Sequence, residues 1–205
     1  MTPDHWQKAK KHLAKRDTVL KKIIAQYEGE LMVKKGDAFL TLCRAIVGQQ
    51  ISVKAADSIW ARFEKALPAV TAKHVAAAHA ESLRACGLST SKVTYLHALA
   101  EHFIKNQRII RRWPELDDDA IIAELTSIKG IGRWTAEMHL IFHLGRPDVL
   151  PLGDIGLLKA IYKHYNNTEK MPLSEVRALA ERWQPYRSVA TWYLWRSLDP
   201  VPVSY

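Results

Sequence analysis

The stretch Leu125-Thr126-Ser127-Ile128-Lys129-Gly130-Ile131-Gly132-Arg133-Trp134-Thr135-Ala136 decides the fold. It is typical of a helix end, a two-glycine hairpin and the start of a second helix. Gly130 and Gly132 can take φ values that a Cβ opposes, and the short turn between them can approach another molecule closely. The second helix begins with unpaired N–H groups that suit a phosphate oxygen. Arg133 adds a positive charge at the same place, so the stretch predicts a phosphate-binding turn.

The charge balance points to an anionic partner. The 205-residue chain holds 30 Lys and Arg against 21 Asp and Glu, a formal net charge of +9. Charge alone is equally compatible with a merely soluble basic protein. Together with the hairpin, it favours the phosphate backbone of DNA as the partner. A hydrophobic content of 48% indicates a folded chain with a substantial core, as one globular unit or two small ones.

The cysteines and the hydropathy exclude other classes of protein. Cys43 and Cys86 lie in apolar helical patterns, so we expect buried, reduced side chains. Two cysteines cannot supply the four thiolates of an iron–sulfur cluster. No apolar run reaches transmembrane length, and no signal peptide precedes the Lys-rich start. We therefore expect no iron–sulfur cluster, no membrane association and no secretion.

Helical periodicity dominates the chain, and strand-like alternation is nearly absent, so we predict an all-α fold of about ten to twelve helices. Asp17 and Ser52 are expected N-caps. On the helix that starts at Asp154 we expect an apolar stripe formed by Ile155, Leu158, Ile161, Tyr162 and Tyr165. The predicted helices cover residues 3–16, 18–28, 37–48, 52–66, 71–79, 91–105, 117–127, 133–144, a segment from 154, 173–183 and 186–197.

Three further motifs accompany the hairpin in order. They are Phe39 to Ala56, centred on Gly48-Gln49-Gln50-Ile51-Ser52; Leu150-Pro151-Leu152-Gly153-Asp154-Ile155-Gly156-Leu157; and Arg182-Trp183-Gln184-Pro185-Tyr186-Arg187-Ser188-Val189-Ala190. Together the four resemble the HhH-GPD superfamily of DNA glycosylases, in its alkylbase branch of the 3-methyladenine DNA glycosylase II (AlkA) type. The resemblance runs from about residue 17 to residue 198.

The resemblance implies a single glycosylase unit over residues 1–205 with two helical lobes. The middle lobe is expected at about 38–146, with the helix-hairpin-helix at 125–136. The second lobe joins about 1–37 to 147–205, and Asp154 is expected in the cleft between the lobes. We expect no N-terminal β-rich domain of the kind that longer AlkA relatives carry.

Asp154 is the candidate catalytic residue. An Asp that follows Gly at a helix start is usually an N-cap, and this role is compatible with catalysis. Cleavage of an N-glycosidic bond builds positive charge on the sugar, so a fixed anion lowers the barrier and can also orient or deprotonate water. The resemblance assigns this work to Asp154. Asp148 is the nearby alternative, for which we expect a turn or a local ion pair.

Aromatic residues are expected to form the base pocket. Trp134 stands where bifunctional hairpin glycosylases carry a Lys nucleophile, so the resemblance implies a monofunctional enzyme that uses water; core packing is the alternative. Trp195 aligns with an aromatic of the family's base pocket, and Trp192 lies nearby. Ring faces attract electron-poor alkylated purines such as 3-methyladenine and 7-methylguanine. Met138 stands where some family members have another aromatic, so the lesion range can differ.

Several residues are candidate DNA contacts besides Gly130, Ile131, Gly132 and Arg133. Gln49-Gln50-Ile51 forms either a short polar connection or the loop that fills the duplex once a base is rotated out, with Gln50 favoured and Ile51 as its neighbour. Lys34, Lys35, Lys92, Arg133 and Arg187 are candidate phosphate contacts. We interpret Lys8, Lys10, Lys11, Lys15 and Arg16 as a solvated helix face.

The sequence offers two candidate metal sites. By family analogy the hairpin binds a monovalent cation, Na⁺ or K⁺, through the backbone carbonyls of Thr126, Ile128 and Ile131. His139 and His143 have the i, i+4 spacing of a zinc helix, but Leu140 replaces the required Glu and no third ligand is evident. We therefore interpret both histidines as packed or exposed, and expect no cofactor for catalysis.

The leading hypothesis is a monomeric repair enzyme that excises alkylated purines from double-stranded DNA. Its expected location is the bacterial cytoplasm at the nucleoid or the eukaryotic nucleus. A second hypothesis keeps the fold but takes uracil, hypoxanthine or another deaminated base. A third is a non-catalytic DNA-binding module, against which Asp154 and Trp195 count, because such a module needs neither a fixed carboxylate nor a base pocket.

Overall fold

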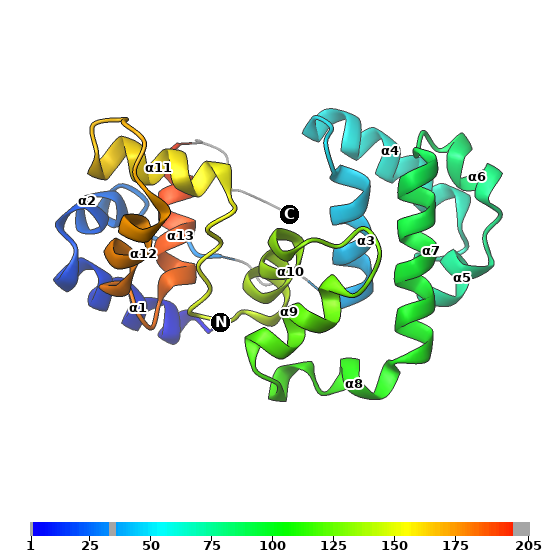
Figure 1. Ribbon diagram of the computed structural model, residues 1–205, viewed down its shortest axis with the longest axis horizontal. Helices are drawn as coiled ribbons and strands as arrows, with labels where there is room; N and C mark the ends of the chain where they lie inside the picture. The colour runs from blue at the N-terminus through cyan, green and yellow to red at the C-terminus, as the bar shows by residue number, and fades with distance from the viewer. Residues whose placement is uncertain (1, 33–35, 199–205) are drawn as a thin grey trace. The chain divides into compact units, whose positions relative to one another are not determined.

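The computed structural model describes residues 2–32 and 36–198, and these ranges contain helices without any strand (Figure 1). The all-α prediction is confirmed. The described chain divides into two compact units, one of residues 36–139 and one of residues 2–32 with 140–198. The lobe boundary expected near residue 146 corresponds to a division between His139 and Leu140. Lys34 and Lys35, two candidate phosphate contacts, lie outside the described residues.

The unit of residues 36–139 is organised around one long helix, α7, which packs against α3 and α5, while α9 packs against α10. Ser52 caps α4 by accepting a hydrogen bond from the Ala55 N–H, as predicted, and Asp117 caps α9 in the same way. Both cysteines are buried and free in this unit. Its helices are α3 (Ala38–Gly48), α4 (Val53–Ala66), α5 (Ala72–Ala77), α6 (Ala80–Ala85), α7 (Thr90–Lys105), α8 (Gln107–Arg111), the 3₁₀ turn η1 (Trp113–Glu115), α9 (Asp118–Thr126) and α10 (Arg133–His139).

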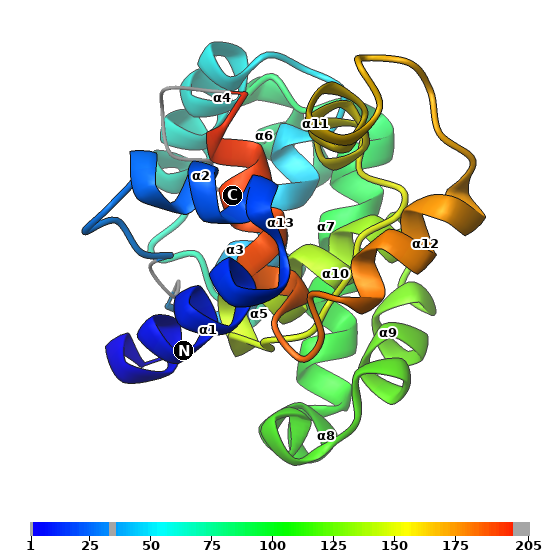
Figure 2. The same cartoon turned by 90° about the vertical axis from the view of Figure 1, so that its left-hand side faces the viewer.

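The second unit joins the two ends of the chain. Figure 2 shows the N-terminal helices beside the C-terminal helix α13, which is buried along most of its length. Asp17 links α2 to two other parts of this unit: its carboxylate caps α2 and also accepts hydrogen bonds from the hydroxyl of Tyr165, at the end of α11, and the indole of Trp183, just after α12, each at 2.9 Å. The helices are α1 (Pro3–Arg16), α2 (Thr18–Gln26), the π-helical turn η2 (Leu140–Leu144), α11 (Ile155–Tyr165), α12 (Leu173–Glu181) and α13 (Arg187–Arg196).

Some predictions about the helices are wrong. The described residues hold thirteen α-helices, more than expected, because the short helices α6 and α8 carry too few residues to show a period. The helix predicted over 133–144 changes to π-helical geometry after His139. The apolar stripe of α11 is only partly correct: Ile161 is buried as predicted, but Ile155 is 69% exposed, and the buried Leu157 and Ala160 were not in the predicted stripe. Apolar residues lie on several faces of α11, so the pattern alone does not select the buried one.

Candidate functional site

Asp154 is buried at the start of α11 and is held by two donors. Its Oδ1 accepts a hydrogen bond of 2.6 Å from the Leu157 N–H and one of 2.8 Å from the Trp195 indole N–H. The carboxylate is 5% exposed. Its predicted role as an N-cap is confirmed. Two donors on one oxygen fix the orientation of the carboxylate, and the helix N-terminus places partial positive charge beside it.

The local sequence builds this corner from small and turn-forming residues. The Asp154 N–H donates to the Pro151 carbonyl at 2.9 Å, which closes the turn before α11. Gly156 follows, where an added Cβ would lie 3.1 Å from Asp154 Oδ1 and 3.4 Å from Trp195 Cδ1. Gly156 therefore leaves the space in which the carboxylate and the indole meet.

Trp195 has a role that sequence reasoning missed. Its indole lies parallel to the ring of Phe142, with 5.9 Å between centroids and 13° between planes, while its N–H donates to Asp154. Both the stacking and the hydrogen bond fix the ring. Trp195 and Asp154 are 41 residues apart, and no short motif records their pairing.

The bond from Trp195 can be tested by Trp195→Phe, which keeps an aromatic ring but removes the donor. A hydrogen bond to a charged group contributes about 1.5–3 kcal/mol, so we expect base excision to slow roughly 10- to 100-fold. If Trp195 acts through Asp154, the same change made in an Asp154→Asn background adds little further loss. Single-turnover rates of the four proteins measure this; full additivity would instead assign Trp195 to direct contact with the base.

The other aromatic candidates have different environments. Trp192 packs edge-on against Trp6 at 5.2 Å and Tyr193 at 4.9 Å between centroids, and it is buried. Its ring serves core packing, and its place in the base pocket stays a prediction. Trp134 is half-buried and Met138 is buried on α10, in the unit of residues 36–139.

The hairpin contains one glycine with a positive φ and one open glycine. Gly130 has φ of +92°, and a Cβ there would lie 2.1 Å from Tyr95 Cγ. Gly132 has no positive φ and no atom within 4 Å of an added Cβ, so the prediction of a left-handed backbone is wrong for it. The side chain of Ile131 is buried, and its N–H donates to the Ile128 carbonyl at 3.1 Å. Ile131 therefore anchors the turn in the core, and only its backbone remains a candidate DNA contact.

Two of the candidate phosphate contacts have partners inside the protein. Lys92 Nζ donates to the Val47 carbonyl at 2.7 Å, and burial lowers the pKa of Lys92. Arg187 binds both carboxylate oxygens of Asp148 at 2.8 Å, so the ion pair of Asp148 is formed with a residue 39 positions away and is not the local one expected. Both basic groups therefore support the fold, which sequence reasoning could not detect.

Arg133 differs from them because it is mostly exposed. Its side chain is 66% exposed at the start of α10, and its Nε lies 2.9 Å from Glu137 Oε1. The charge stands beside the open Gly132, where the helix presents its first N–H groups. This corner remains the best candidate for a phosphate contact.

The loop between α3 and α4 carries exposed side chains on a strained backbone. Gln50 is exposed and has φ of +58°, a backbone region that residues other than Gly rarely adopt. Ile51 and Val53 are exposed apolar residues beside it. Gln49 is not simply a surface residue, because its Nε2 donates to the Gly130 carbonyl at 2.9 Å.

The histidines and acidic residues form no metal centre in the described part of the chain, where no three His, Cys, Asp or Glu side chains could share an ion. His139 is buried and packs edge-on against Trp113 at 5.1 Å between centroids, as a packed histidine should. In the same described residues, no helix combines the length and the apolar character needed to cross a bilayer.

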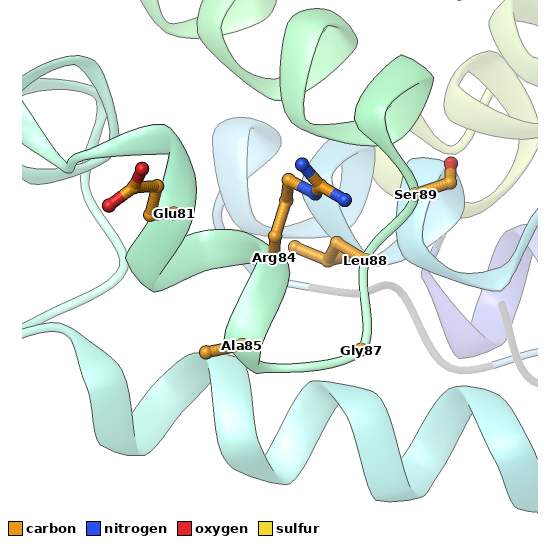
Figure 3. A pocket seen from close by; sticks show the side chains of 6 residues that line it. All are labelled: Glu81, Arg84, Ala85, Gly87, Leu88 and Ser89. Carbon is orange, nitrogen blue, oxygen red and sulfur yellow. The ribbon is translucent and has the colours of Figure 1, made fainter.

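A pocket of about 530 Å³ lies elsewhere, between the end of α6 and the start of α7. Figure 3 shows the Arg84 side chain, which comes from α6, beside Leu88 in the connection to α7, with Ser89 at the start of α7. None of the predicted site residues lines this pocket. It is lined by Glu81, Arg84, Ala85, Gly87, Leu88 and Ser89.

Known proteins are similar to this chain in sequence and in fold. The family model for HhH-GPD superfamily base excision DNA repair proteins matches residues 43–185. DNA-3-methyladenine glycosylase 1 of Schizosaccharomyces pombe is 34% identical and aligns over 93% of this chain and 86% of its own length. A structure of a 3-methyladenine DNA glycosylase from Schizosaccharomyces pombe in complex with abasic DNA has a TM-score of 0.82, with 31% identity over 97% of this chain and 100% of that one. A DNA-3-methyladenine glycosidase structure from Bacillus halodurans has a TM-score of 0.77 with 32% identity, covering 88% of this chain and 89% of its own.

Proposed function

The chain belongs to the HhH-GPD superfamily of base excision DNA repair proteins, and we propose that it is a monofunctional glycosylase for alkylated purines in DNA. Its substrates are duplexes that contain bases such as 3-methyladenine and 7-methylguanine. The observation that carries the proposal is the Asp154 carboxylate, fixed by the Leu157 and Trp195 N–H groups. The relatives named 3-methyladenine glycosylases support the choice of base.

The proposed reaction is hydrolysis of the N-glycosidic bond. The bond from C1′ to the base breaks, and its electron pair leaves with the base, which an alkyl group has already made electron-poor. Positive charge develops on the sugar, and the Asp154 carboxylate stabilises it electrostatically. A water oxygen then bonds to C1′ and releases a proton, and we assign the Asp154 carboxylate as the base that accepts it. The products are a free base and an abasic site.

The residue at Trp134 supports the absence of a lyase step. An amine nucleophile attacks C1′ to form a Schiff base in the bifunctional relatives, and an indole cannot do so. We therefore assign the attack to water. Trp134 and Met138 are proposed to bind the base by stacking and by soft, polarisable contact.

The hairpin supports the proposed binding of the DNA backbone. Arg133 and the first N–H groups of α10 are the assigned phosphate donors, and the exposed Gly132 leaves room for the backbone to approach. Gln50 and Ile51 are the assigned residues that fill the space left by the rotated base. An enzyme of this kind works where the genome is, at the nucleoid or in the nucleus.

A monovalent cation is also part of the proposal. The Thr126, Ile128 and Ile131 carbonyls offer the hard oxygen donors that Na⁺ or K⁺ takes, and a carbonyl oxygen has two lone pairs. The Ile128 carbonyl already accepts the Ile131 N–H, which holds the turn and leaves one lone pair. Such an ion would supply positive charge beside the phosphate.

The decisive experiment is chromatography of bases released from methylated duplex DNA in buffer with a chelator. We expect free 3-methyladenine and 7-methylguanine with no strand nicking. Parallel duplexes with uracil or hypoxanthine test the other class of lesion, and release of those bases alone would replace the proposed substrate. Tight DNA binding with no base released would leave only a binding module. If the hairpin holds a cation, replacing potassium with choline in the same buffer should weaken DNA binding, measured separately as the affinity for the duplex.

A further inference from the structure

A polar contact attaches the loop between α3 and α4 to the hairpin within one unit. Gln49 and Gly130 are 81 residues apart, yet the Gln49 amide donates to the Gly130 carbonyl at 2.9 Å. Both residues belong to the unit of residues 36–139. The contact therefore joins the loop that carries Gln50 to the turn that carries Gly132.

Both ends of this contact are held firmly. On one side, Gly130 lies against the Tyr95 ring, so closely that no side chain fits there. On the other side, Lys92 Nζ donates to the Val47 carbonyl in the last turn of α3. A cation at this position also complements the negative end of the helix dipole. Tyr95 and Lys92 lie one turn apart on α7, so this helix supports both elements.

The loop needs such support because its conformation is unfavourable by itself. Gln50 is held at φ of +58°, and a strained residue persists only where its surroundings impose the geometry. Ile51 is exposed beside it at the surface of the loop, without a core to hold it. The Gln49 amide bonds the loop to an element beyond the two helices that flank it.

We propose that Gln49 is a positioning residue, which fixes the base-replacing loop to the phosphate-binding hairpin so that both engage DNA as one body. The proposal rests on the function proposed above. It replaces the direct DNA contact predicted for Gln49 from the sequence. Gln49 acts through Gln50 and Ile51, and its effect should appear only when the loop must enter the base stack.

The test compares Gln49→Met, which keeps the length but removes the amide, with Gln107→Met, an exposed control on α8. Affinity is measured for an undamaged duplex and for one that contains a tetrahydrofuran abasic-site analogue. The Gln49 variant should lose about fivefold of its preference for the analogue, the worth of one hydrogen bond, with unchanged affinity for undamaged DNA. Gln107→Met should change neither.

A second arm uses 7-methylguanine either paired in a duplex or placed in an unpaired bubble. Excision by the Gln49 variant should slow about fivefold in the duplex and match the wild type in the bubble, where the base is already unpaired and costs less to rotate out. A merely structural role would affect both substrates alike. Gln49→Asn, which keeps the amide but shortens its reach, should repeat the pattern if Gln49→Met folds poorly.

Two results would overturn the proposal: an equal loss of affinity for undamaged and abasic duplexes, which indicates direct contact with DNA, or no change with either. Failure of the proposed function gives a different pattern. In that case the wild type releases no base from any substrate, while the affinity ratio for the abasic analogue still reports whether Gln49 positions the loop.

Discussion

Asp154→Asn is expected to abolish base excision while DNA binding persists. Asparagine is isosteric and caps helices as well as aspartate, so its Oδ1 can accept the same Leu157 and Trp195 N–H groups. The free energy of unfolding of the variant should therefore lie within about 1 kcal/mol of that of the wild type. It lacks the negative charge that stabilises the cationic sugar, so the single-turnover rate should fall on the order of 100- to 1,000-fold or more. Release of 7-methylguanine from a duplex measures the rate, and fluorescence anisotropy measures the binding.

Asp148→Asn is the matched control for this substitution. Asp148 lies near Asp154 in the sequence, but its carboxylate holds the Arg187 guanidinium through two bonds of 2.8 Å. Its loss should lower the free energy of unfolding by about 1–3 kcal/mol and leave the excision rate of the folded protein within a few-fold. Excision by a folded Asp154→Asn protein within tenfold of the wild type would remove Asp154 from the reaction. A loss confined to Asp148→Asn would move the catalytic role to that residue.

The sequence was sufficient for the features that depend on neighbouring residues. Helix periodicity and capping residues located most helices, and Asp17, Ser52 and Asp154 act as N-caps because a cap bonds only two or three residues ahead. The hairpin is predicted from its two glycines and the short turn between them. Such interactions are local, so the pattern along the chain contains them.

Contacts between distant residues were beyond sequence reasoning. A lysine in the first turn of a helix is normally interpreted as a surface charge, and only the structure shows that Lys92 reaches the Val47 carbonyl. Gln49 was a plausible DNA contact, but its amide points to a carbonyl of the hairpin. The same holds for the Trp195 bond to Asp154. In each case the polar group satisfies a buried or half-buried partner, which is costly to leave unpaired.

The two hairpin glycines should respond differently to alanine, although they are separated by one residue. Gly130→Ala forces a side chain into the left-handed region and drives its Cβ into the Tyr95 ring, 2.1 Å from Cγ. The two effects together should destabilise the fold by about 2–5 kcal/mol, measured by urea unfolding. In a double-mutant cycle, Tyr95→Ala should recover only the clash with the ring, because its own Cβ still lies 2.6 Å from the added Cβ, and it should leave the backbone part.

Gly132→Ala has neither handicap, because no atom lies within 4 Å of its added Cβ and its φ is not positive. Its stability should stay within about 0.5 kcal/mol of the wild type, since exposed substitutions away from special backbone geometry change little. Affinity for duplex DNA should nevertheless fall, by roughly tenfold, because the new methyl group occupies the space through which a phosphate approaches the first N–H groups of α10. A stable Gly132→Ala protein that binds DNA like the wild type would show that the phosphate does not approach there. The first N–H groups of α10 would then lose their assigned role.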